Sequence, residues 1–90
     1  MQETKYYIYE FFLPNGKVEK GLAKNVEFSP NKITYSRIGY FDGMNFLILT
    51  KTPNNKNIMA NIACVFTETT LEDILSFANG EKLERLKKLV

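Results

Sequence analysis

Residues 5–13, KYYIYEFFL, are a run of aromatic and β-branched residues that predicts a β-strand. Successive side chains of a strand point to opposite faces, and here both faces are apolar. One face carries Tyr7, Tyr9, Phe11 and Leu13, and the other carries Tyr6, Ile8, Glu10 and Phe12. A strand with one solvated face would show polar residues at alternate positions, so this strand must be covered on both sides.

The stretch 33–66 has the same character and consists of apolar runs at 33–41, 44–52 and 58–66. Asp42-Gly43 lies between the first two runs and predicts a two-residue hairpin turn. That turn pairs Gly39 with Phe46 and leaves both faces of the hairpin largely apolar. The polar segment 53–57, PNNKN, predicts an exposed loop before the last run.

The segment 17–28 follows a tight turn at Pro14-Asn15-Gly16 and fits two structures. Its alternation fits a strand, whereas the four-residue spacing of Val18, Leu22 and Val26 also fits a helix. The glycine at position 21 and the preceding hairpin turn favour the strand. The predicted strands are therefore 5–13, 17–28, 33–41, 44–52 and 58–66.

The C-terminal part of the chain predicts helices over about 70–78 and 81–89. Thr69 and Glu72 have the spacing of a capping box at the start of the first helix. An apolar stripe at helical spacing follows, and Asn79-Gly80 ends or bends the helix. Since the sequence shows no repeat or linker, we expect residues 1–90 to form a single domain.

These elements predict an α+β fold, in which a five-stranded antiparallel meander sheet carries a C-terminal helix or helix pair on one face. The helices leave the second apolar face of the sheet without cover. Two arrangements would cover it: the sheet curls into a small barrel, or two copies of the chain pack together. The density of aromatic residues in 5–13 favours a homodimer, because an exposed apolar patch of that size is a liability on a monomer.

The sequence contains no histidine and one cysteine, Cys64. This composition removes the commonest general base, the Ser-His and Cys-His nucleophile pairs, and a structural zinc site. Neither a phosphate-binding glycine motif nor the spacing of a calcium loop is present. We therefore expect a protein that is not an enzyme and needs no cofactor or metal.

The formal net charge is +2, from 12 Lys and Arg against 10 Asp and Glu, which is too small to indicate a polyanionic partner by itself. The N-terminal stretch lacks the basic and apolar regions of a signal peptide. No apolar run approaches the ~20 residues needed to cross a bilayer. We expect a cytoplasmic protein that does not associate with membranes.

Arg37 and Glu10 each lie in the middle of an apolar strand face, where an unpaired charge is costly if buried. They either pair with each other or reach solvent at the sheet edge. Alternatively, Arg37 forms the floor of a site between sheet and helix that holds a small anionic ligand, such as a nucleotide. The sequence leaves both interpretations open.

The tyrosines and lysines predict a binding surface, whose candidate residues are Arg37, Tyr35, Tyr40, Tyr7, Tyr9 and Lys51. Such residues suit a protein interface, a platform for single-stranded nucleic acid, or an ordinary core. The leading hypothesis is a small binding protein that occupies or sequesters a protein partner, as accessory and phage-type inhibitor proteins do. A nucleic-acid-binding module and a pocket for a small anionic ligand are the alternatives.

Overall fold

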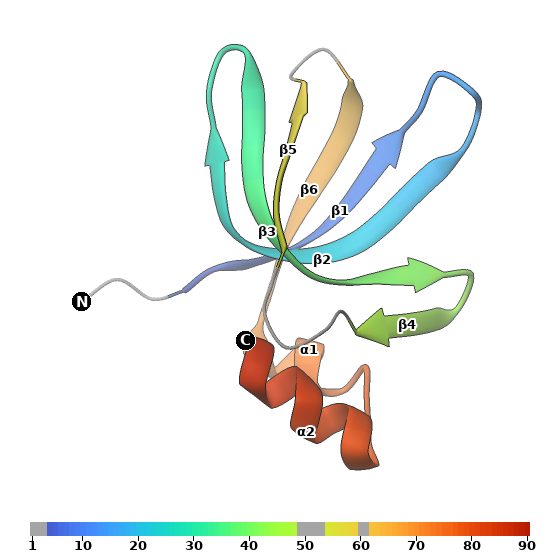
Figure 1. Ribbon diagram of the computed structural model, residues 1–90, viewed down its shortest axis with the longest axis vertical. Helices are drawn as coiled ribbons and strands as arrows, with labels where there is room; N and C mark the ends of the chain where they lie inside the picture. Colours follow the sequence, from blue (N-terminus) through green and yellow to red (C-terminus); the bar gives the residue numbers. More distant parts are fainter. Residues whose placement is uncertain (1–3, 49–53, 60–61) are drawn as a thin grey trace.

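The computed structural model describes residues 4–48, 54–59 and 62–90. They form an antiparallel sheet with a C-terminal helix pair packed on it, which confirms the predicted α+β fold (Figure 1). The strands are β1 (Tyr6–Phe12), β2 (Val18–Phe28), β3 (Lys32–Asp42), β4 (Asn45–Ile48), β5 (Asn54–Met59) and β6 (Ala63–Thr69), and the helices are α1 (Leu71–Leu75) and α2 (Gly80–Leu89). The segment 17–28 is thus a strand, as favoured.

One edge of β3 is shared by two strands, and this changes the predicted strand boundaries. β4 pairs with residues 39–42 of β3, and β5 pairs with residues 32–37 along the same edge. The predicted strand 44–52 is confirmed over Asn45–Ile48, and its remainder, 49–52, lies outside the described residues. The predicted loop 53–57 is wrong, because residues 54–57 belong to β5. β5 pairs with β3 through backbone hydrogen bonds, which do not depend on the type of side chain. The polar sequence of β5 therefore does not indicate a strand.

The last strand, β6, pairs with β1 and not with the strand before it. The predicted strand 58–66 is therefore divided: its first two residues end β5, and β6 begins at Ala63. The amide of Ile62 donates to the carbonyl of Met59 at 3.1 Å, so the start of β6 lies close to the end of β5. These two strands lie at opposite ends of the order β5-β3-β2-β1-β6. The sheet therefore curls so that its two edges approach each other, but it is not closed into the barrel that the sequence allowed, since no ladder joins β5 to β6 within the described residues.

The curl is made possible by irregularities between β2 and β3. The register shifts between Leu22 and Ala23 and again between Lys24 and Glu27. Asn25, inside the second shift, has a φ of +54°, a left-handed conformation that asparagine tolerates better than most residues. Such bulges bend a strand and increase its twist. As a result, β2 turns sharply at its middle, and its two ends rise as separate arms in Figure 1.

Two hydrophobic clusters cover the two faces of the sheet. The helix-side cluster lies between the sheet and the helices and contains Tyr6, Leu22, Ile38, Phe46, Ile74, Leu86 and Leu89. The aromatic cluster lies inside the curl and contains the buried residues Tyr9, Phe11, Ala23 and Tyr35, with Ile58, Cys64 and Phe66 packed against them. β1 is covered on both sides over part of its length, as its sequence predicts, although Phe12 at its end is 44% exposed. Since the curl covers the second face, that face no longer argues for a homodimer, and the oligomeric state stays a prediction.

The β3–β4 hairpin has a different register from the expected one. Its ladder pairs Gly39 with Ile48 and Asp42 with Asn45, so the two turn residues are Gly43 and Met44. The predicted pairing of Gly39 with Phe46 is wrong, but the ring of Phe46 still lies diagonally over the glycine. A Cβ atom at Gly39 would lie 2.7 Å from Cζ of Phe46. The aromatic ring therefore covers bare backbone, which is the packing the sequence indicated.

The helix boundaries also differ in detail. The N-cap of α1 is Thr70 and not Thr69, and its hydroxyl accepts a hydrogen bond from the amide of Asp73 at 3.1 Å. The predicted helix 70–78 is shorter, because α1 ends at Leu75. The chain then turns at Asn79, which precedes α2 as its N-cap residue. Leu86 and Leu89 of α2 and Ile74 of α1 are buried against the sheet, so the helix pair covers one face as expected.

Candidate functional site

Arg37 lies on β3 and pairs with Glu19 of β2. Its Nη1 atom is 3.8 Å from Oε1 of Glu19, and the guanidinium lies 5.5 Å from the centre of the Tyr40 ring. The predicted pairing of Arg37 with Glu10 is wrong, because Glu10 lies opposite Lys20 and Val65 on the other face of the sheet. The Arg37 side chain is 18% exposed, so it reaches solvent in part.

The face that carries Arg37 is the one turned away from the helices. Arg37 is the ladder partner of Ala23, which belongs to the aromatic cluster, and antiparallel partners share a face. The predicted site between sheet and helix is therefore not built around this residue. Arg37 lines neither the pocket over β2, β3 and β5 nor the pocket between the start of β1 and the end of β6. Its partners are a carboxylate and an aromatic ring of the same chain.

Tyr9 and Tyr35 pack together in the aromatic cluster, with ring centres 5.3 Å apart. Burial raises the pKa of Tyr35 to about 12, and the nearby Glu19 carboxylate adds to this effect. Burial likewise raises the pKa of Tyr9 far above its usual value, although the Arg37 guanidinium nearby opposes this. The Tyr9 hydroxyl and Nε of Arg37 are buried and make no hydrogen bond of standard geometry within the described residues. Both tyrosines are neutral, structural residues.

The remaining candidate residues are not brought into one surface. Tyr7 is half-buried and lies edge-on to Phe66, with ring centres 6.3 Å apart. Tyr40 is half-buried beside Arg37, near the C-terminal end of β3. Lys51 lies outside the described residues. The predicted tyrosine and lysine platform therefore does not form as a continuous exposed surface, because its central tyrosines are buried.

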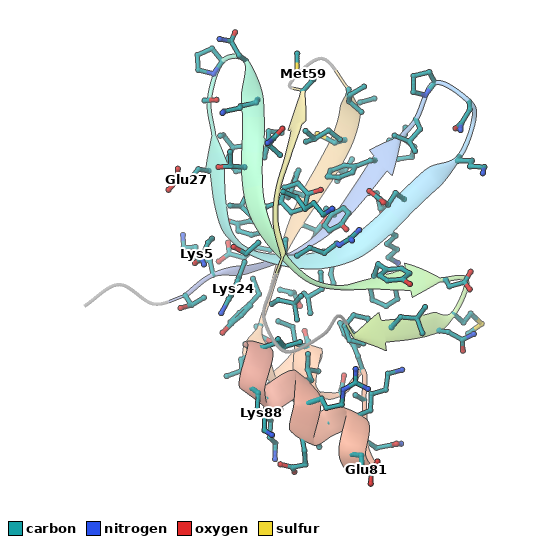
Figure 2. The ribbon with its side chains drawn as sticks, viewed as in Figure 1. Lys5, Lys24, Glu27, Met59, Glu81 and Lys88 are labelled. Carbon is teal, nitrogen blue, oxygen red and sulfur yellow. The ribbon has the colours of Figure 1, made fainter. Side chains whose placement is uncertain are left out.

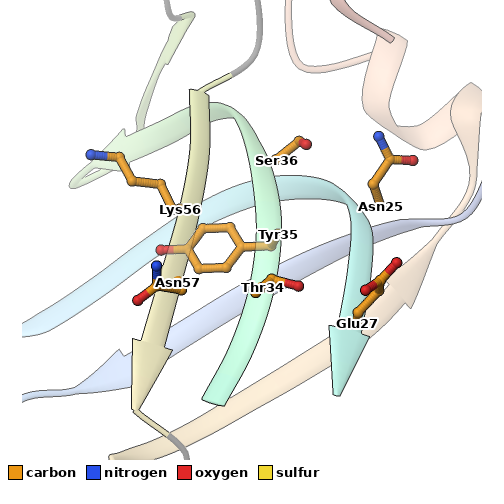
Figure 3. Close-up of a pocket in the computed structure, with 7 residues that line it drawn as sticks. All are labelled: Asn25, Glu27, Thr34, Tyr35, Ser36, Lys56 and Asn57. Carbon is orange, nitrogen blue, oxygen red and sulfur yellow. The ribbon is translucent and has the colours of Figure 1, made fainter. Parts of the chain in front are cut away.

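A polar pocket of about 410 Å³ lies over the C-terminal end of β2, the first half of β3 and the middle of β5 (Figure 3). It is lined by Asn25, Glu27, Thr34, Tyr35, Ser36, Lys56 and Asn57. In Figure 3, Asn25 and Glu27 project from β2 on one side, and Lys56 and Asn57 lie along β5 on the other. One acidic and one basic side chain balance each other, and the amides and hydroxyls both donate and accept. The pocket therefore has no preference for an anion.

Two large apolar side chains stand exposed at the ends of strands that line this pocket. Phe28, at the end of β2, is 62% exposed, and Met59, at the end of β5, is 60% exposed. Their ladder partners, Ile33 and Lys32, are consecutive residues of β3, so Phe28 lies on the face of the aromatic cluster and Met59 lies on the opposite face. Figure 2 shows Met59 at the end of the sheet farthest from α2 and Glu27 projecting outward on β2. We call the strand ends that carry Phe28 on one face and Met59 on the other, together with the neighbouring polar pocket, the arm surface.

The ring of Phe28 is held in place from inside the molecule. It lies edge-on to Phe66 with ring centres 5.5 Å apart, and Phe66 in turn packs against Phe11 and Tyr35. Phe28 is therefore the outer member of the aromatic cluster and is exposed in a defined position. The sequence does not single it out, because Phe28 continues the alternating apolar positions Val18, Leu22 and Val26 of the predicted strand. The sequence signal that could have identified Phe28 is its position at the end of a strand, directly before the Ser29-Pro30-Asn31 turn, where no later residue of the strand covers it.

A second pocket, of about 510 Å³, lies between the start of β1 and the end of β6 and includes Lys5, Glu68 and Thr70. Within the described residues, no group of three or more acidic or cysteine side chains is placed to hold a metal ion. In the same part of the chain, no helix has the length and apolar character required to cross a bilayer.

Comparisons with protein-family models, with curated proteins and with solved structures found no match for this chain. The fold and the site therefore define the protein only as an antiparallel sheet, curled over an aromatic cluster, with a C-terminal helix pair.

Proposed function

We propose that this protein is a non-enzymatic binding protein of the cytoplasm that acts by occupying or sequestering a protein partner, and that it binds this partner through the arm surface. The observation that carries the proposal is the exposure of Phe28 while its ring packs edge-on against Phe66. A large aromatic side chain that is exposed and already ordered can fill a partner's pocket with little loss of conformational freedom.

The surroundings of Phe28 match the usual anatomy of an interface. Aromatic residues and methionine are enriched at the centres of interfaces, and polar groups form their rims. On the arm surface, Phe28 and Met59 supply one apolar side chain on each face of the strand ends, and the neighbouring pocket supplies Glu27, Lys56 and two amides. Because the charges are balanced, the surface suits a partner that offers an apolar cavity with a neutral, hydrogen-bonding margin.

The experiment is affinity capture from the native host with three forms of the tagged protein. These are the natural sequence, the double variant Phe28→Ser with Met59→Ser, and the control Met44→Ser. Met44 is fully exposed at the tip of the β3–β4 hairpin and matches Met59 in chemistry but not in position. The proposal requires a protein that the natural form and the control capture and the double variant does not.

For the purified pair, we expect the double variant to weaken binding by at least about 30-fold, the effect of losing a hot spot of ~2 kcal/mol. The thermal unfolding of each form shows whether the fold is retained. If every captured protein binds the double variant as well as the natural form, the arm surface is not the binding site.

The alternative functions gain no support from the geometry. Tyr6, Tyr9 and Tyr35 are buried, so they cannot stack on the bases of a single-stranded nucleic acid. An anionic ligand such as a nucleotide would require an unbalanced positive charge, whereas Arg37 already faces Glu19, and Lys56 shares its pocket with Glu27.

A further inference from the structure

The strand β6 forms one edge of the sheet, and within the described residues its only ladder partner is β1. The two strands pair in one continuous register from Ala63 to Thr69 of β6. Four of the seven side chains of β6 are exposed. A strand at the edge of a sheet presents a row of unpaired backbone amides and carbonyls, which can pair with a further strand.

The hydrogen bonds of the β1–β2 turn show which backbone groups of β6 point outward. The amide of Leu13 donates to the carbonyl of Lys17 at 2.9 Å, so the backbone groups of Leu13 point toward β2. Because successive residues of a strand direct these groups to opposite sides, the even-numbered residues of β1 direct theirs toward β6. There they meet the odd-numbered residues of β6. The even-numbered residues, Cys64, Phe66 and Glu68, therefore direct their amides and carbonyls away from β1.

The chain just before β6 agrees with this assignment. The amide of Ile62, two residues before Cys64, donates to the carbonyl of Met59 and not to β1. Within the part of the chain that the structure describes, Cys64, Phe66 and Glu68 make no backbone hydrogen bond on their outward side. A strand laid along β6 would therefore find three amide donors and three carbonyl acceptors.

The edge of β6 lacks the features that usually keep free edges from pairing, which are charged residues, proline, bulges and short length. From Ala63 to Thr67 its sequence, ACVFT, contains no charged residue and no proline. On the opposite side of the sheet, the outer strands are shorter: β4 has four residues, and β5 has six and carries Lys56. The edge of β6 is thus the long, regular and uncharged one.

The side chains along β6 define the chemistry of a strand that would fit there. On one face, Cys64 and Phe66 belong to the aromatic cluster, and the exposed ring of Phe28 lies edge-on to Phe66. On the other face, Val65 is 48% exposed. Glu68, near the end of β6, is also exposed. A fitting segment therefore has apolar side chains on both faces and a basic side chain opposite Glu68.

We propose that β6 binds an extended segment of the protein partner as an additional antiparallel strand. The segment bonds to the outward amides and carbonyls of Cys64, Phe66 and Glu68, and its lysine or arginine pairs with Glu68. In strand addition of this kind, the backbone hydrogen bonds supply affinity and the alternate side chains supply specificity. The inference rests on the proposed function, since the segment belongs to the proposed partner, but it uses the backbone of β6 and not the side chains of the arm surface.

The first test uses the peptide acetyl-TKTVVVT-amide, whose second, fourth and sixth residues are designed to lie opposite Glu68, Phe66 and Cys64. Amide hydrogen exchange of the full chain is followed by NMR with and without this peptide. At about ten times the Kd of the peptide, these three amides should exchange about tenfold more slowly. The amides of Val65 and Thr67, which already face β1, should change little. No slowing of the three amides at the highest soluble peptide concentration overturns the inference.

N-methylation of the peptide separates backbone pairing from other modes of binding. Methyl groups on the amides of its second, fourth and sixth residues remove the donors that face β6, which should weaken binding at least about tenfold. Methyl groups on the third and fifth residues lie on the far side and should leave the affinity nearly unchanged. Equal affinities of the two methylated peptides contradict strand addition. These measurements need no partner, so they succeed or fail separately from the proposed function.

For a captured partner, the test uses Cys64→Pro and Glu68→Pro, with Cys64→Ala and Glu68→Ala as matched controls. Each proline removes an outward amide and leaves the ladder with β1 intact, since an edge strand tolerates proline where its amide faces solvent. The partner should bind each alanine variant at least about tenfold more tightly than the matching proline variant. Far-ultraviolet spectra show that the four variants are folded.

A partner that binds the alanine and proline variants equally, but not the Phe28→Ser with Met59→Ser double variant, overturns this inference and leaves the arm surface as the binding site. Light scattering tests a different occupant of the same edge. If the natural chain is a dimer that Cys64→Pro converts to a monomer, a second copy fills the edge, and the assignment to a partner protein is wrong.

Discussion

The phenol ring of Tyr9 on β1 lies flat against Gly21, its ladder partner on β2. A Cβ atom at Gly21 would overlap the hydroxyl end of this ring, and Tyr9 is fully buried. The ring cannot move aside easily, because it is stacked on Phe11 with ring centres 4.5 Å apart and packs against Tyr35. The absence of a side chain at Gly21 is therefore a requirement of the aromatic cluster.

We predict that Gly21→Ala lowers the free energy of unfolding by about 1–3 kcal/mol, the usual cost of adding a methyl group to a filled core. Urea unfolding measures this. In a Tyr9→Leu background, the same substitution should cost much less, because the overlapping ring atoms are gone. An equal cost in both backgrounds would place the cause elsewhere than in the contact between these two residues.

The buried tyrosines predict a loss of stability at alkaline pH. Burial raises the pKa of Tyr35 from 10 to about 12 and raises that of Tyr9 as well. Above pH 10, the unfolded chain loses phenol protons that the folded chain retains, so the free energy of unfolding falls as the pH rises. This stabilisation is fully present below pH 10, and it is lost as the pH rises through the pKa that each tyrosine has in the folded protein. For each such tyrosine, the slope is about 1.4 kcal/mol per pH unit.

Urea unfolding at a series of pH values from 9 to 12 measures this slope, and the absorbance of tyrosinate near 295 nm shows when the phenols ionise. The Tyr9→Phe and Tyr35→Phe variants should each reduce the slope. Tyr40→Phe is a suitable control, because Tyr40 is only half-buried. A slope that none of the substitutions changes would assign the alkaline unfolding to other groups.

Arg37→Met distinguishes a structural role of Arg37 from a role in binding. The pair with Glu19 is partly exposed, and such pairs contribute at most about 1 kcal/mol. We expect the free energy of unfolding to change by no more than about that amount, since methionine keeps much of the apolar stem. Capture of the partner should be unchanged, because Arg37 lies outside the arm surface. Loss of the partner from a stable Arg37→Met variant would restore Arg37 as a binding residue.

Asn25 holds the bulge that bends β2, at a φ of +54°. We expect Asn25→Val to cost about 1–2 kcal/mol, because a β-branched residue is strongly disfavoured in this conformation. Asn25→Gly should be nearly neutral. Asn57→Val, on an exposed position of β5, is the control and should have little effect. These values come from the midpoint and slope of urea unfolding, and equal costs for the two valine variants would contradict the assigned strain.

Local patterns predicted most of the elements and the two-faced character of β1. Alternation in 5–13 placed Tyr9 and Phe11 on one face and Tyr6 on the other, and each face has its own buried cluster. Of the candidate site, little could be predicted. Arg37 stood out as a charge on an apolar face, but its partner Glu19 depended on the bulges between β2 and β3. The exposure of Phe28 depended on the bend in β2 that carries it to the end of one arm.

The sequence by itself determined which residues are strand or helix over most of the chain and which side chains share a face, because both follow from periods of two and 3.6 residues. Only the tertiary structure decided which strands are neighbours. Every residue except proline offers the same backbone donor and acceptor, so the ladders of Asn-rich β5 with β3 and of β6 with β1 have no signature in the side chains. Both can form in one sheet because the bent β2 curls the sheet over the rings of Tyr9, Phe11 and Tyr35, so that the consecutive strands β5 and β6 pair at different edges.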